Sequence, residues 1–466
     1  MRPRRRRGEY GWYHETRLSS LRSRGIFIIG SRFLECGRKM TELIFDKWAK
    51  LYSERTSLMR SSEIRNLLSV TARPDIISFA GGLPDTRSFP MERMVETTRR
   101  VMRREGSAAL QYGPSEGHQG LKEIIATLMR EDGMDVDTEE IIITDGAQQG
   151  LELIGKIFID RDDEIIVEAP SYVGGLQAFS SHQAKIIPVA LDEDGLRVDL
   201  LEDTLKKLKR EGHAPKFLYV VPTFHNPAGV TLSAKRRQRL LELAHENNLL
   251  IIEDDPYSRL RFEGQPVRPL RSMDESVVYL GTFSKIFCPG LRLGWVAAPR
   301  PIVEKLIFAK QAADLCTSSL SQRLVEEYFT SHPWKAHLKK LVKTYKRRRD
   351  AMLESLEEFF PPEASWTKPG GGLFLWATLP DYIDTTEMLA EAIDEEKVAY
   401  IPGRAFFHDG SGKNCMRLNF SYPEEEQIRE GIKRLAKVVR RQMELYETFA
   451  KGVHLNSGDS NEKGSD

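Results

Sequence analysis

The sequence predicts an α/β fold, with a large domain built on a mainly parallel sheet and a smaller α+β domain beside it. Short runs rich in β-branched residues alternate with amphipathic helical stretches, which is the pattern of a parallel sheet. The runs lead into polar or glycine-bearing loops, as buried parallel strands do. The chain of 466 residues is too long for one ordinary domain and long enough for two packed ones.

Six runs are the predicted strands of the large domain. In chain order they read EIIIT, EIIV, KIIPV, FLYVV, LLII and VVYL, at residues 140–144, 164–167, 185–189, 217–221, 249–252 and 277–280. Each is short, apolar and rich in β-branched or aromatic residues, which favours a strand over a helix.

Two later stretches, 321–331 and 334–359, are predicted helices that bridge the domains. In the second, the apolar residues Leu338, Leu341 and Tyr345 recur at helical spacing. The basic run around them, "WKAHLKKLVKTYKRRRD", is therefore expected to be a solvated helix face rather than a nucleic-acid contact.

The expected organisation has five parts. They are a basic extension (1–39), an arm joining the smaller domain (40–75), the large domain (76–320), the bridging helix with the smaller domain (321–448) and a tail (449–466). Both ends are expected to be disordered. The arginine-rich start is either an upstream start-site artefact, with Met40 the true first residue, or a transit peptide, which its glutamates argue against. A nucleic-acid-binding arm has no support downstream.

The composition points to a small substrate. Lys and Arg number 69 against 68 Asp and Glu, so the formal charge of +1 indicates neither nucleic acid nor an anionic membrane as a partner. The apolar run 26–29 is far short of the roughly 20 residues that span a bilayer. The four cysteines, Cys36, Cys288, Cys316 and Cys415, have no metal-binding spacing, which predicts free thiols, no metal and a reducing compartment, the cytoplasm.

The candidate functional residues follow the predicted strands. Ligands of open α/β sheets bind beyond the carboxyl ends of the strands, so these positions should meet at one rim. In chain order they are the stretch "DGAQQG" from Asp145 to Gly150, then Tyr172, Asn226, Asp254 with Tyr257, and Lys285.

Lys285 is the most informative of them. It stands among Phe283, Ile286 and Phe287, where a charged ammonium is costly and burial lowers the pKa towards a reactive amine. Taken alone, Lys285 is better interpreted as a solvated loop lysine. The polar residues that follow the other predicted strands favour a chemical role for Lys285.

One ligand would use all of these groups: pyridoxal phosphate, whose aldehyde condenses with a lysine amine. Lys285 would supply that amine. Asp254 would hold the proton on the ring nitrogen; the alternative interpretation is that Asp254 merely caps a loop beside Asp255. Asn226 and Tyr257 would hydrogen-bond the phenolic oxygen, and Tyr172 would stack on the ring.

The phosphate of such a cofactor needs donors. The glycine turn before Ala147 and Gln148 predicts a helix N-terminus with free backbone N–H groups. Thr282, Ser284 and Arg292 lie close to Lys285 in sequence and would add two hydroxyls and a guanidinium. Arg292 is read alternatively as a surface ion pair.

These motifs resemble those of the fold-type I, class I/II pyridoxal-phosphate-dependent aminotransferases, over about residues 55–440. "NPAG", "DDPY" and "SKIFCPGLRLGW" occur in order, with Asn226, Asp254, Lys285 and Arg292 at the family's positions for phenolic oxygen, ring nitrogen, imine and phosphate. "SSEIRNLL", "ISFAGGLPDTRSFP" and "LQYGPSEGHQGLKE" are similar to the 2-aminoadipate and kynurenine aminotransferase subgroup.

The resemblance implies further residues. Arg417 of "NCMRLNFS" would bind the substrate α-carboxylate, and Gly82 would contact the substrate. Tyr112 would reach the phosphate of a neighbouring subunit, which implies a homodimer. Ser62 and Arg65 would meet the substrate side chain. Where some relatives carry Ser, this chain has Ala147, which leaves only a backbone donor.

Several of these residues also have an ordinary structural interpretation. Tyr172 and Tyr112 read alternatively as half-buried packing residues, and Arg417 as an ion pair. The histidines are interpreted as structural, and His225 is the one beside the site.

The predicted activity is transamination by a ping-pong mechanism with pyridoxal phosphate as cofactor. The amino donor would be 2-aminoadipate, glutamate, leucine or an aromatic amino acid, and the acceptor a 2-oxo acid such as 2-oxoglutarate. The alternatives are a C–S lyase or decarboxylase on the same cofactor, and an aminotransferase-like regulator. A Rossmann dehydrogenase is disfavoured because no GxGxxG follows the first strand.

Overall fold

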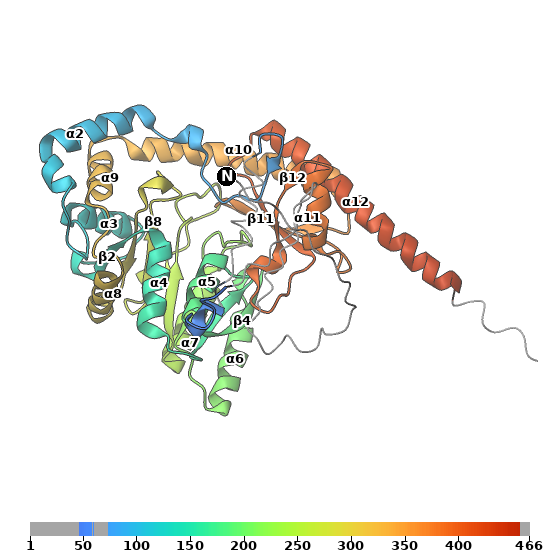
Figure 1. Ribbon diagram of the computed structural model, residues 1–466, viewed down its shortest axis with the longest axis horizontal. Coiled ribbons are helices and arrows are strands. Elements are labelled where there is room, and N and C mark those ends of the chain that lie inside the picture. The colour runs from blue at the N-terminus through green and yellow to red at the C-terminus, as the bar shows by residue number, and fades with distance from the viewer. Residues whose placement is uncertain (1–45, 58, 60–72, 457–466) are drawn as a thin grey trace, which may run out of the picture. The chain divides into compact units, whose positions relative to one another are not determined.

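The computed structural model describes residues 46–57, 59 and 73–456 (Figure 1). The chain divides into two units, residues 1–58 and 59–466. In the first, the described part is a turn followed by a short 3-10 helix, η1 (Glu54–Ser57). The predicted extension 1–39 and most of the arm 40–75 lie outside the described residues. The second unit contains the three sheets and the candidate site.

An eight-stranded sheet forms the centre of this second unit. Its spatial order is β2-β9-β8-β7-β6-β3-β4-β5. The strands are β2 (Ile141–Thr144), β3 (Glu164–Ala169), β4 (Lys185–Asp192), β5 (Gly195–Leu196), β6 (Phe217–Val220), β7 (Leu250–Asp254), β8 (Val278–Thr282) and β9 (Gly294–Ala297). All six predicted strands are present, and the neighbours among β4, β3, β6, β7 and β8 pair in parallel.

Two strands of this eight-stranded sheet were not predicted. β5 pairs antiparallel with β4 at one edge, and β9 lies antiparallel between β2 and β8. β9 is only four residues long and begins with a glycine, so its sequence carries little strand signal. Its direction has a consequence for the site, because an antiparallel strand starts at the edge where its parallel neighbours end.

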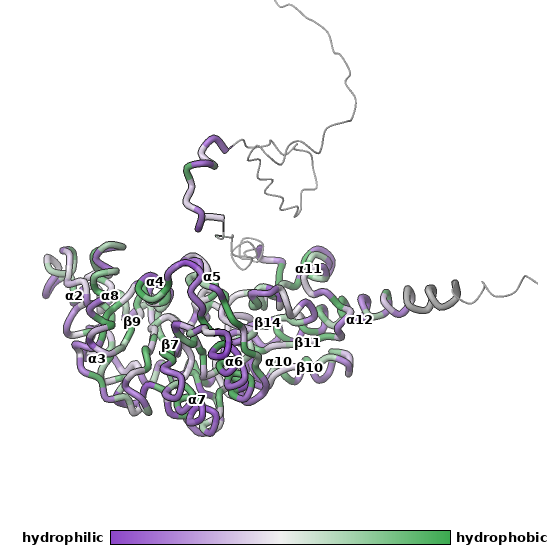
Figure 2. The backbone as a smooth tube through the Cα atoms, turned by 90° about the horizontal axis from the view of Figure 1, so that it is seen from below, coloured by the Kyte–Doolittle hydropathy of each residue, from purple (hydrophilic) through white to green (hydrophobic). Residues whose placement is uncertain are grey.

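Side chains alternate between the two faces of the sheet. Ile165 and Val167 pack with α4 (Gly146–Phe158), α5 (Val173–Ser181) and α8 (Arg300–Ala313), whereas Ile166 between them packs with α6 and α7. The bounds of these last helices are α6 (Val198–Glu211) and α7 (Ala234–Asn247). Figure 2 shows α6 and α7 largely purple, as expected of helices with one face in water.

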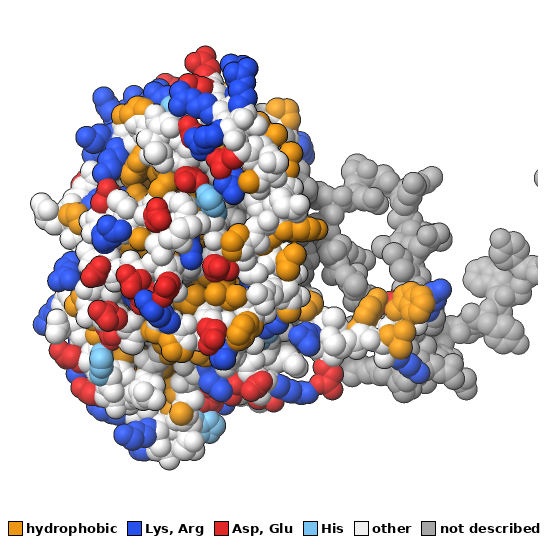
Figure 3. Space-filling model, turned by 90° about the vertical axis from the view of Figure 1, so that its left-hand side faces the viewer, with side chains coloured by type: hydrophobic (Ala, Val, Ile, Leu, Met, Phe, Trp, Pro, Cys, Tyr) orange, Lys and Arg blue, Asp and Glu red, His pale blue; other side chains and the backbone are white. Residues whose placement is uncertain are grey.

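A third group of helices covers the sheet around β2 and β9. Ile143, Tyr279 and Trp295 pack there with α3 (Gln119–Glu131), α9 (Ser319–Ser331) and α10 (Trp334–Phe359). α9 packs on α2 (Met91–Ala109). On this side of the molecule, basic and acidic side chains are interspersed with apolar ones (Figure 3). The two stretches predicted as helices, 321–331 and 334–359, are helical, as α9 and α10.

The helix α10 is less solvated than its basic sequence suggested. Leu341 and Tyr345 are buried as predicted, and Lys339, Lys340 and Lys343 are exposed. However, of the three consecutive arginines that follow, Arg347 is exposed and the other two are buried. Arg348 pairs with Asp85 at 2.9 Å and Arg349 with Glu263 at 2.7 Å. The carboxylates compensate the charge of these two buried guanidinium groups.

The C-terminal part of the chain builds a second core. A four-stranded antiparallel sheet has the order β10-β11-β14-β13, and β1 pairs in parallel with β12. The elements are β1 (Ile77–Ser78), β10 (Ser365–Trp366), β11 (Phe374–Thr378), α11 (Thr385–Asp394), β12 (Val398–Ala399), β13 (Ile401–Pro402), β14 (Cys415–Asn419) and α12 (Glu425–Asn456). In Figure 1, α10 runs from the side of α2 and α9 to this core, where it packs on α12.

The last helix continues further than expected. α12 ends at Asn456, so part of the predicted tail from residue 449 is helical. Residues 440–451 are mostly strong helix formers and contain no proline, which explains the continuation. None of the described helices has the length and apolar composition needed to cross a membrane. Cys288, Cys316 and Cys415 are free thiols, and Cys36 lies outside the described residues.

Candidate active site

The carboxyl ends of five strands place the candidate residues at one edge of the large sheet. Lys285 follows β8, and Asp254 is the last residue of β7. Arg292 lies just before β9, which starts at this same edge because it runs antiparallel to β8. The remaining positions are Gly146 and its successors after β2, Tyr172 after β3 and Asn226 after β6.

Lys285 is partly buried, and its amine is engaged. Nζ donates a hydrogen bond to the carbonyl oxygen of Gly82 at 2.9 Å, so the two predicted residues meet although 203 positions separate them. Burial lowers the pKa of Lys285 to about 8, and the positive charges of Arg417 and Arg292 act in the same direction. A neutral amine is therefore accessible near physiological pH, as nucleophilic or base chemistry requires.

The two adjacent aspartates differ in one decisive respect. Asp255 Oδ1 accepts from the Ser258 backbone N–H and Oδ2 from the Tyr279 hydroxyl, both at 3.0 Å. Asp254 Oδ2 accepts from the Tyr219 hydroxyl at 2.8 Å, but the buried Oδ1 finds no partner among the described residues. Burial, its largest influence, raises the pKa of Asp254 to about 7. An unpaired buried carboxylate oxygen is expensive unless a ligand donates to it.

Asn226 links two other predicted residues. Its Nδ2 donates to the Tyr257 hydroxyl at 3.4 Å, and its Oδ1 accepts from Arg417 Nη1 at 3.0 Å. All three side chains are buried. Burial raises the pKa of Tyr257, with Tyr172 adding to the effect, so this phenol stays protonated. The cluster offers a donor phenol and a cation within one apolar enclosure.

Arg417 lies on β14, opposite Trp376 of β11. Its Nη2 donates to the Ala80 carbonyl at 2.8 Å, and its guanidinium lies 4.2 Å from the Phe374 ring centroid and 5.1 Å from that of Phe406. The Nε atom is buried without a hydrogen-bond partner in the described part of the chain. Burial lowers the pKa of Arg417 to about 10. A guanidinium held this way suits a carboxylate.

Tyr172 lies at the N-terminus of α5 and reaches back to α4. Its hydroxyl donates to Gln148 Oε1 at 3.2 Å, and Gln148 Nε2 donates to the Gly174 carbonyl at 2.9 Å. Burial raises the pKa of Tyr172 to about 12, with Asp254 the next cause. The Gln148 side chain is thus used in holding Tyr172, which leaves its backbone N–H for a ligand.

The turn into α4 forms a narrow cradle with Arg292. Gly146 has φ of 71°, and a Cβ placed on it would lie 2.6 Å from Arg292 Nη2. Arg292 Nη2 donates to the Asp145 carbonyl at 3.1 Å, while the side chain as a whole is exposed. Thr282 Oγ1 lies 3.0 Å from Ser284 Oγ. Free N–H groups at a helix start, two hydroxyls and a guanidinium form an anion site.

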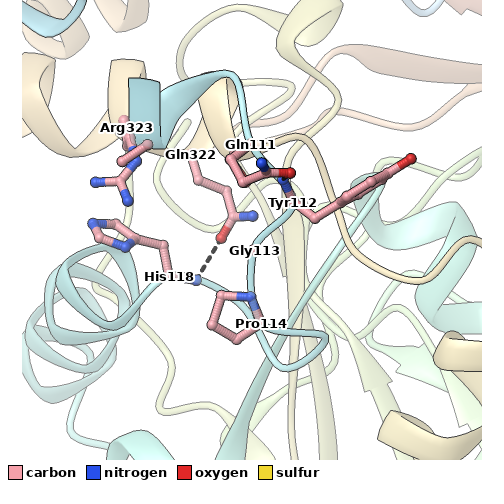
Figure 4. Close-up of a pocket in the computed structure, with 9 residues that line it drawn as sticks. Gln111, Tyr112, Gly113, Pro114, His118, Gln322 and Arg323 are labelled. Carbon is pink, nitrogen blue, oxygen red and sulfur yellow. Dashed lines mark hydrogen bonds between the residues drawn. The ribbon is translucent and has the colours of Figure 1, made fainter. Parts of the chain in front are cut away.

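Tyr112 stands apart from these residues. It is 77% exposed and lines a cavity of about 190 Å³ formed by the end of α2, the loop after it and the start of α9. There the His118 backbone N–H donates to Gln322 Oε1 at 2.7 Å, and the Tyr112 side chain points away from this bond (Figure 4). Ser62 and Arg65 lie outside the described residues.

Sequence reasoning missed three residues of the site. Tyr219 carries the bond to Asp254, and Phe374 with Phe406 encloses the Arg417 guanidinium. A tyrosine hydroxyl within the apolar run FLYVV was a usable signal, because a buried hydroxyl needs a partner. The two phenylalanines gave no signal. His225, interpreted as structural, is buried, accepts from the Ala228 N–H at 3.1 Å and lies 3.2 Å from Glu168.

Together these features place a lysine of lowered pKa, a carboxylate with an unpaired oxygen and a glycine turn beside a guanidinium at one edge of an α/β sheet. Residues 74–435 match the family of class I and class II aminotransferases. The chain belongs to this family. Its relatives include aminotransferases named for 2-aminoadipate and for kynurenine.

Three comparisons define the likeness further. An aromatic-amino-acid aminotransferase from Thermococcus litoralis is 48% identical over 399 residues, 85% of this chain and 95% of that protein. A multiple substrate aminotransferase from Thermococcus profundus is 44% identical with a TM-score of 0.82, over 86% of this chain and 100% of that one. The α-aminoadipate aminotransferase LysN from Thermus thermophilus, complexed with N-(5′-phosphopyridoxyl)-L-leucine, is 36% identical with a TM-score of 0.80, over 86% and 100%.

The predicted fold type I architecture, the family and the cofactor, pyridoxal 5′-phosphate, are thereby confirmed. The residues present fit this cofactor. Asp254 Oδ1 is an acceptor in need of a donor, and the glycine cradle beside Arg292 has no room for a side chain. No group of three or more His, Cys, Asp and Glu side chains within residues 46–57 and 73–456 is arranged to hold a metal ion.

Proposed function

We propose that this aminotransferase takes its amino group from 2-aminoadipate, glutamate, leucine or an aromatic amino acid. It passes the group to a 2-oxo acid such as 2-oxoglutarate in a ping-pong cycle. The observation that carries the proposal is Arg417, a buried guanidinium with an unused nitrogen, which is joined through Asn226 to Tyr257 and whose charge helps to lower the pKa of Lys285. Such a group holds an α-carboxylate.

The geometry of the cluster supports the following cofactor contacts. Asp254 Oδ1 would accept a hydrogen bond from the ring nitrogen, and Asn226 and Tyr257 would donate to the phenolic oxygen. Tyr172 would pack on the ring face, and Lys285 would supply the amine for the covalent link. The phosphate would be held by the backbone N–H groups of Ala147 and Gln148, the hydroxyls of Thr282 and Ser284, and Arg292.

The residues then act on the amino acid in turn. Arg417 fixes the α-carboxylate, which orients the Cα–H bond for cleavage in preference to the carboxylate bond. Once the substrate amine has displaced it, the freed neutral amine of Lys285 would take the proton from Cα. When bound, pyridoxal 5′-phosphate supplies an electron sink for this step and carries the amino group between the half-reactions.

The Lys285→Ala variant tests this assignment. We expect loss of transamination by more than a thousandfold, with no visible absorption from a covalently bound cofactor. Lys185→Ala is a control, since this lysine pairs with Glu164 at the first residues of β4 and β3, opposite the carboxyl ends that carry the site. Normal turnover by Lys285→Ala contradicts the proposal. Release by the wild type of CO₂, or of more than one equivalent of oxo acid per site, without an amine acceptor favours a lyase or decarboxylase instead.

The donor range is supported by the names of relatives, which include aromatic amino acids, aminoadipate and multiple substrates. Arg65 and Ser62 remain the proposed contacts for the substrate side chain. Kinetics over a panel of amino donors decides the range. If Arg65→Ala lowers kcat/KM for aminoadipate no more than for leucine, the assignment of Arg65 is wrong.

A homodimer with shared sites completes the proposal. Tyr112 is largely exposed, and α2 with the loop after it carries the exposed apolar residues Met91, Val95, Met102 and Leu110. An exposed apolar set of this kind favours a protein contact. Light scattering should give the mass of a dimer, and Tyr112→Phe should weaken cofactor binding without dissociating it. A monomer with full activity would refute the shared site.

A further inference from the structure

Tyr219 occupies the middle of β6, close to the acid of the site. Its side chain is fully buried. In the strand register Tyr219 stands opposite Ile252 of β7, so Asp254 is its diagonal neighbour on the same face of the sheet. The hydroxyl donates to Asp254 Oδ2 at 2.8 Å. The bond joins residues fixed by two adjacent central strands and leaves little freedom to the carboxylate.

This hydrogen bond makes the two oxygens of Asp254 different. Oδ2 is used by Tyr219, and Oδ1 is the buried atom without a partner in the described residues. Burial raises the pKa of Asp254, and the bond from Tyr219 is the largest influence that opposes the rise. Burial and the nearby Asp254 raise the pKa of Tyr219 well above its usual value, so its hydroxyl remains a donor.

The ring of Tyr219 has room beside α5 because residue 175 is a glycine. A Cβ on Gly175 of α5 would lie 2.9 Å from Tyr219 Cε1 and 3.2 Å from its hydroxyl oxygen. Phe179, one turn further along α5, meets the ring edge to face at 5.4 Å between centroids. The tyrosine reaches Asp254 because glycine leaves room for it.

We propose that Tyr219 is a positioning residue for the cofactor, which acts by aiming Asp254 Oδ1 at the ring nitrogen and by stabilising the carboxylate in its charged form. The inference rests on the proposed role of Asp254. It goes beyond that role because Tyr219 itself touches neither cofactor nor substrate.

The chain offers a matched control on the opposite face of the same sheet. Tyr279 of β8 stands opposite Glu253 and is the diagonal neighbour of Asp255, to which it donates at 3.0 Å. Tyr279 is 3% exposed. The two tyrosines thus make equivalent bonds to consecutive aspartates. Only the bond to Asp254 concerns an acid with an oxygen left for the cofactor.

The experiment compares Tyr219→Phe with Tyr279→Phe, each with pyridoxal 5′-phosphate. The dissociation constant is measured by equilibrium dialysis, and ¹⁵N NMR of cofactor labelled at the ring nitrogen reports its protonation. We expect Tyr219→Phe to weaken binding about tenfold or more, the usual effect of removing a hydrogen bond to a charged group. The ¹⁵N signal should move towards the unprotonated nitrogen. Tyr279→Phe should change neither, although it loses a comparable bond.

Two further variants separate the possible failures. Gly175→Ala retains the hydroxyl but displaces the ring, so it should weaken binding in the same direction, and it serves if Tyr219→Phe does not fold. Asp254→Asn should weaken binding more than either. If Tyr219→Phe and Gly175→Ala behave like Tyr279→Phe while Asp254→Asn is impaired, the role of Tyr219 is refuted and that of Asp254 stands. If Asp254→Asn is also unimpaired, both are wrong.

Discussion

Replacing Asp254 by Asn should stabilise the cofactor-free protein at alkaline pH while weakening cofactor binding. Folding raises the pKa of this carboxyl from 3.8 to about 7. The folded protein therefore binds the proton more tightly than the unfolded chain does. The stability from this group is fully present below about pH 4 and is lost as the pH rises through 7.

The size of the effect follows from the shift. A difference of about three pKa units corresponds to about 4 kcal/mol at the limit, and to about 2–3 kcal/mol between pH 5 and pH 8. An amide does not titrate, so the free energy of unfolding of Asp254→Asn relative to wild type should rise by this amount over that interval. Because the charge that pairs with the ring nitrogen is lost, cofactor affinity should fall about a hundredfold or more.

Urea unfolding of both proteins without cofactor, at pH 5 and at pH 8, measures the first effect. Titration with pyridoxal 5′-phosphate measures the second. Asp255→Asn is the control, because both oxygens of Asp255 already have donors. It should be destabilised at both pH values. A difference between Asp254→Asn and wild type that is the same at pH 5 and pH 8 would refute the reasoning.

Three other outcomes follow from the site. Uptake of cofactor by the cofactor-free protein should accelerate with pH, half-maximally near pH 8, because the neutral amine of Lys285 is the reacting form; stopped-flow absorbance measures it. Arg417→Lys should lower kcat/KM about 10- to 100-fold for every amino donor, since one ammonium cannot replace the fork that binds Asn226 and a carboxylate. A smaller effect on one donor than on the others contradicts a common α-carboxylate site. Gly146→Ala should weaken binding of both the cofactor and inorganic phosphate in calorimetry. The added Cβ would displace the Arg292 side chain, and Gly146 has a left-handed backbone conformation that alanine disfavours. Unchanged phosphate affinity contradicts the cradle.

Much of the fold and of the site was predictable from local sequence. The runs 164–167 and 217–221 are strands because short β-branched stretches bounded by polar loops suit a buried parallel sheet. Parallel strands end at a common edge of the sheet. The edge that carries Asn226, Asp254 and Lys285 therefore followed from the predicted parallel direction of the strands. The glycine turn before Ala147 indicated a helix start by the same kind of local rule.

The pairing between distant segments was not predictable. The sequence did not show that β9 runs antiparallel between β2 and β8, which brings Arg292 to the rim. The family resemblance selected Asp254 over Asp255, but local sequence alone did not show why, since the difference depends on which face of the sheet each side chain meets. Tyr219 and Tyr279 take opposite faces, and each binds the aspartate on its own side.

The sequence by itself determined the order of strands and helices and the chemical groups that follow them, because hydrophobic periodicity and turn chemistry act over a few residues. Only the tertiary structure decided the hydrogen bonds among those groups. Asn226 and Arg417, 191 residues apart, meet through the packing of two sheets, and their orientation is set by strand register and burial rather than by any local preference.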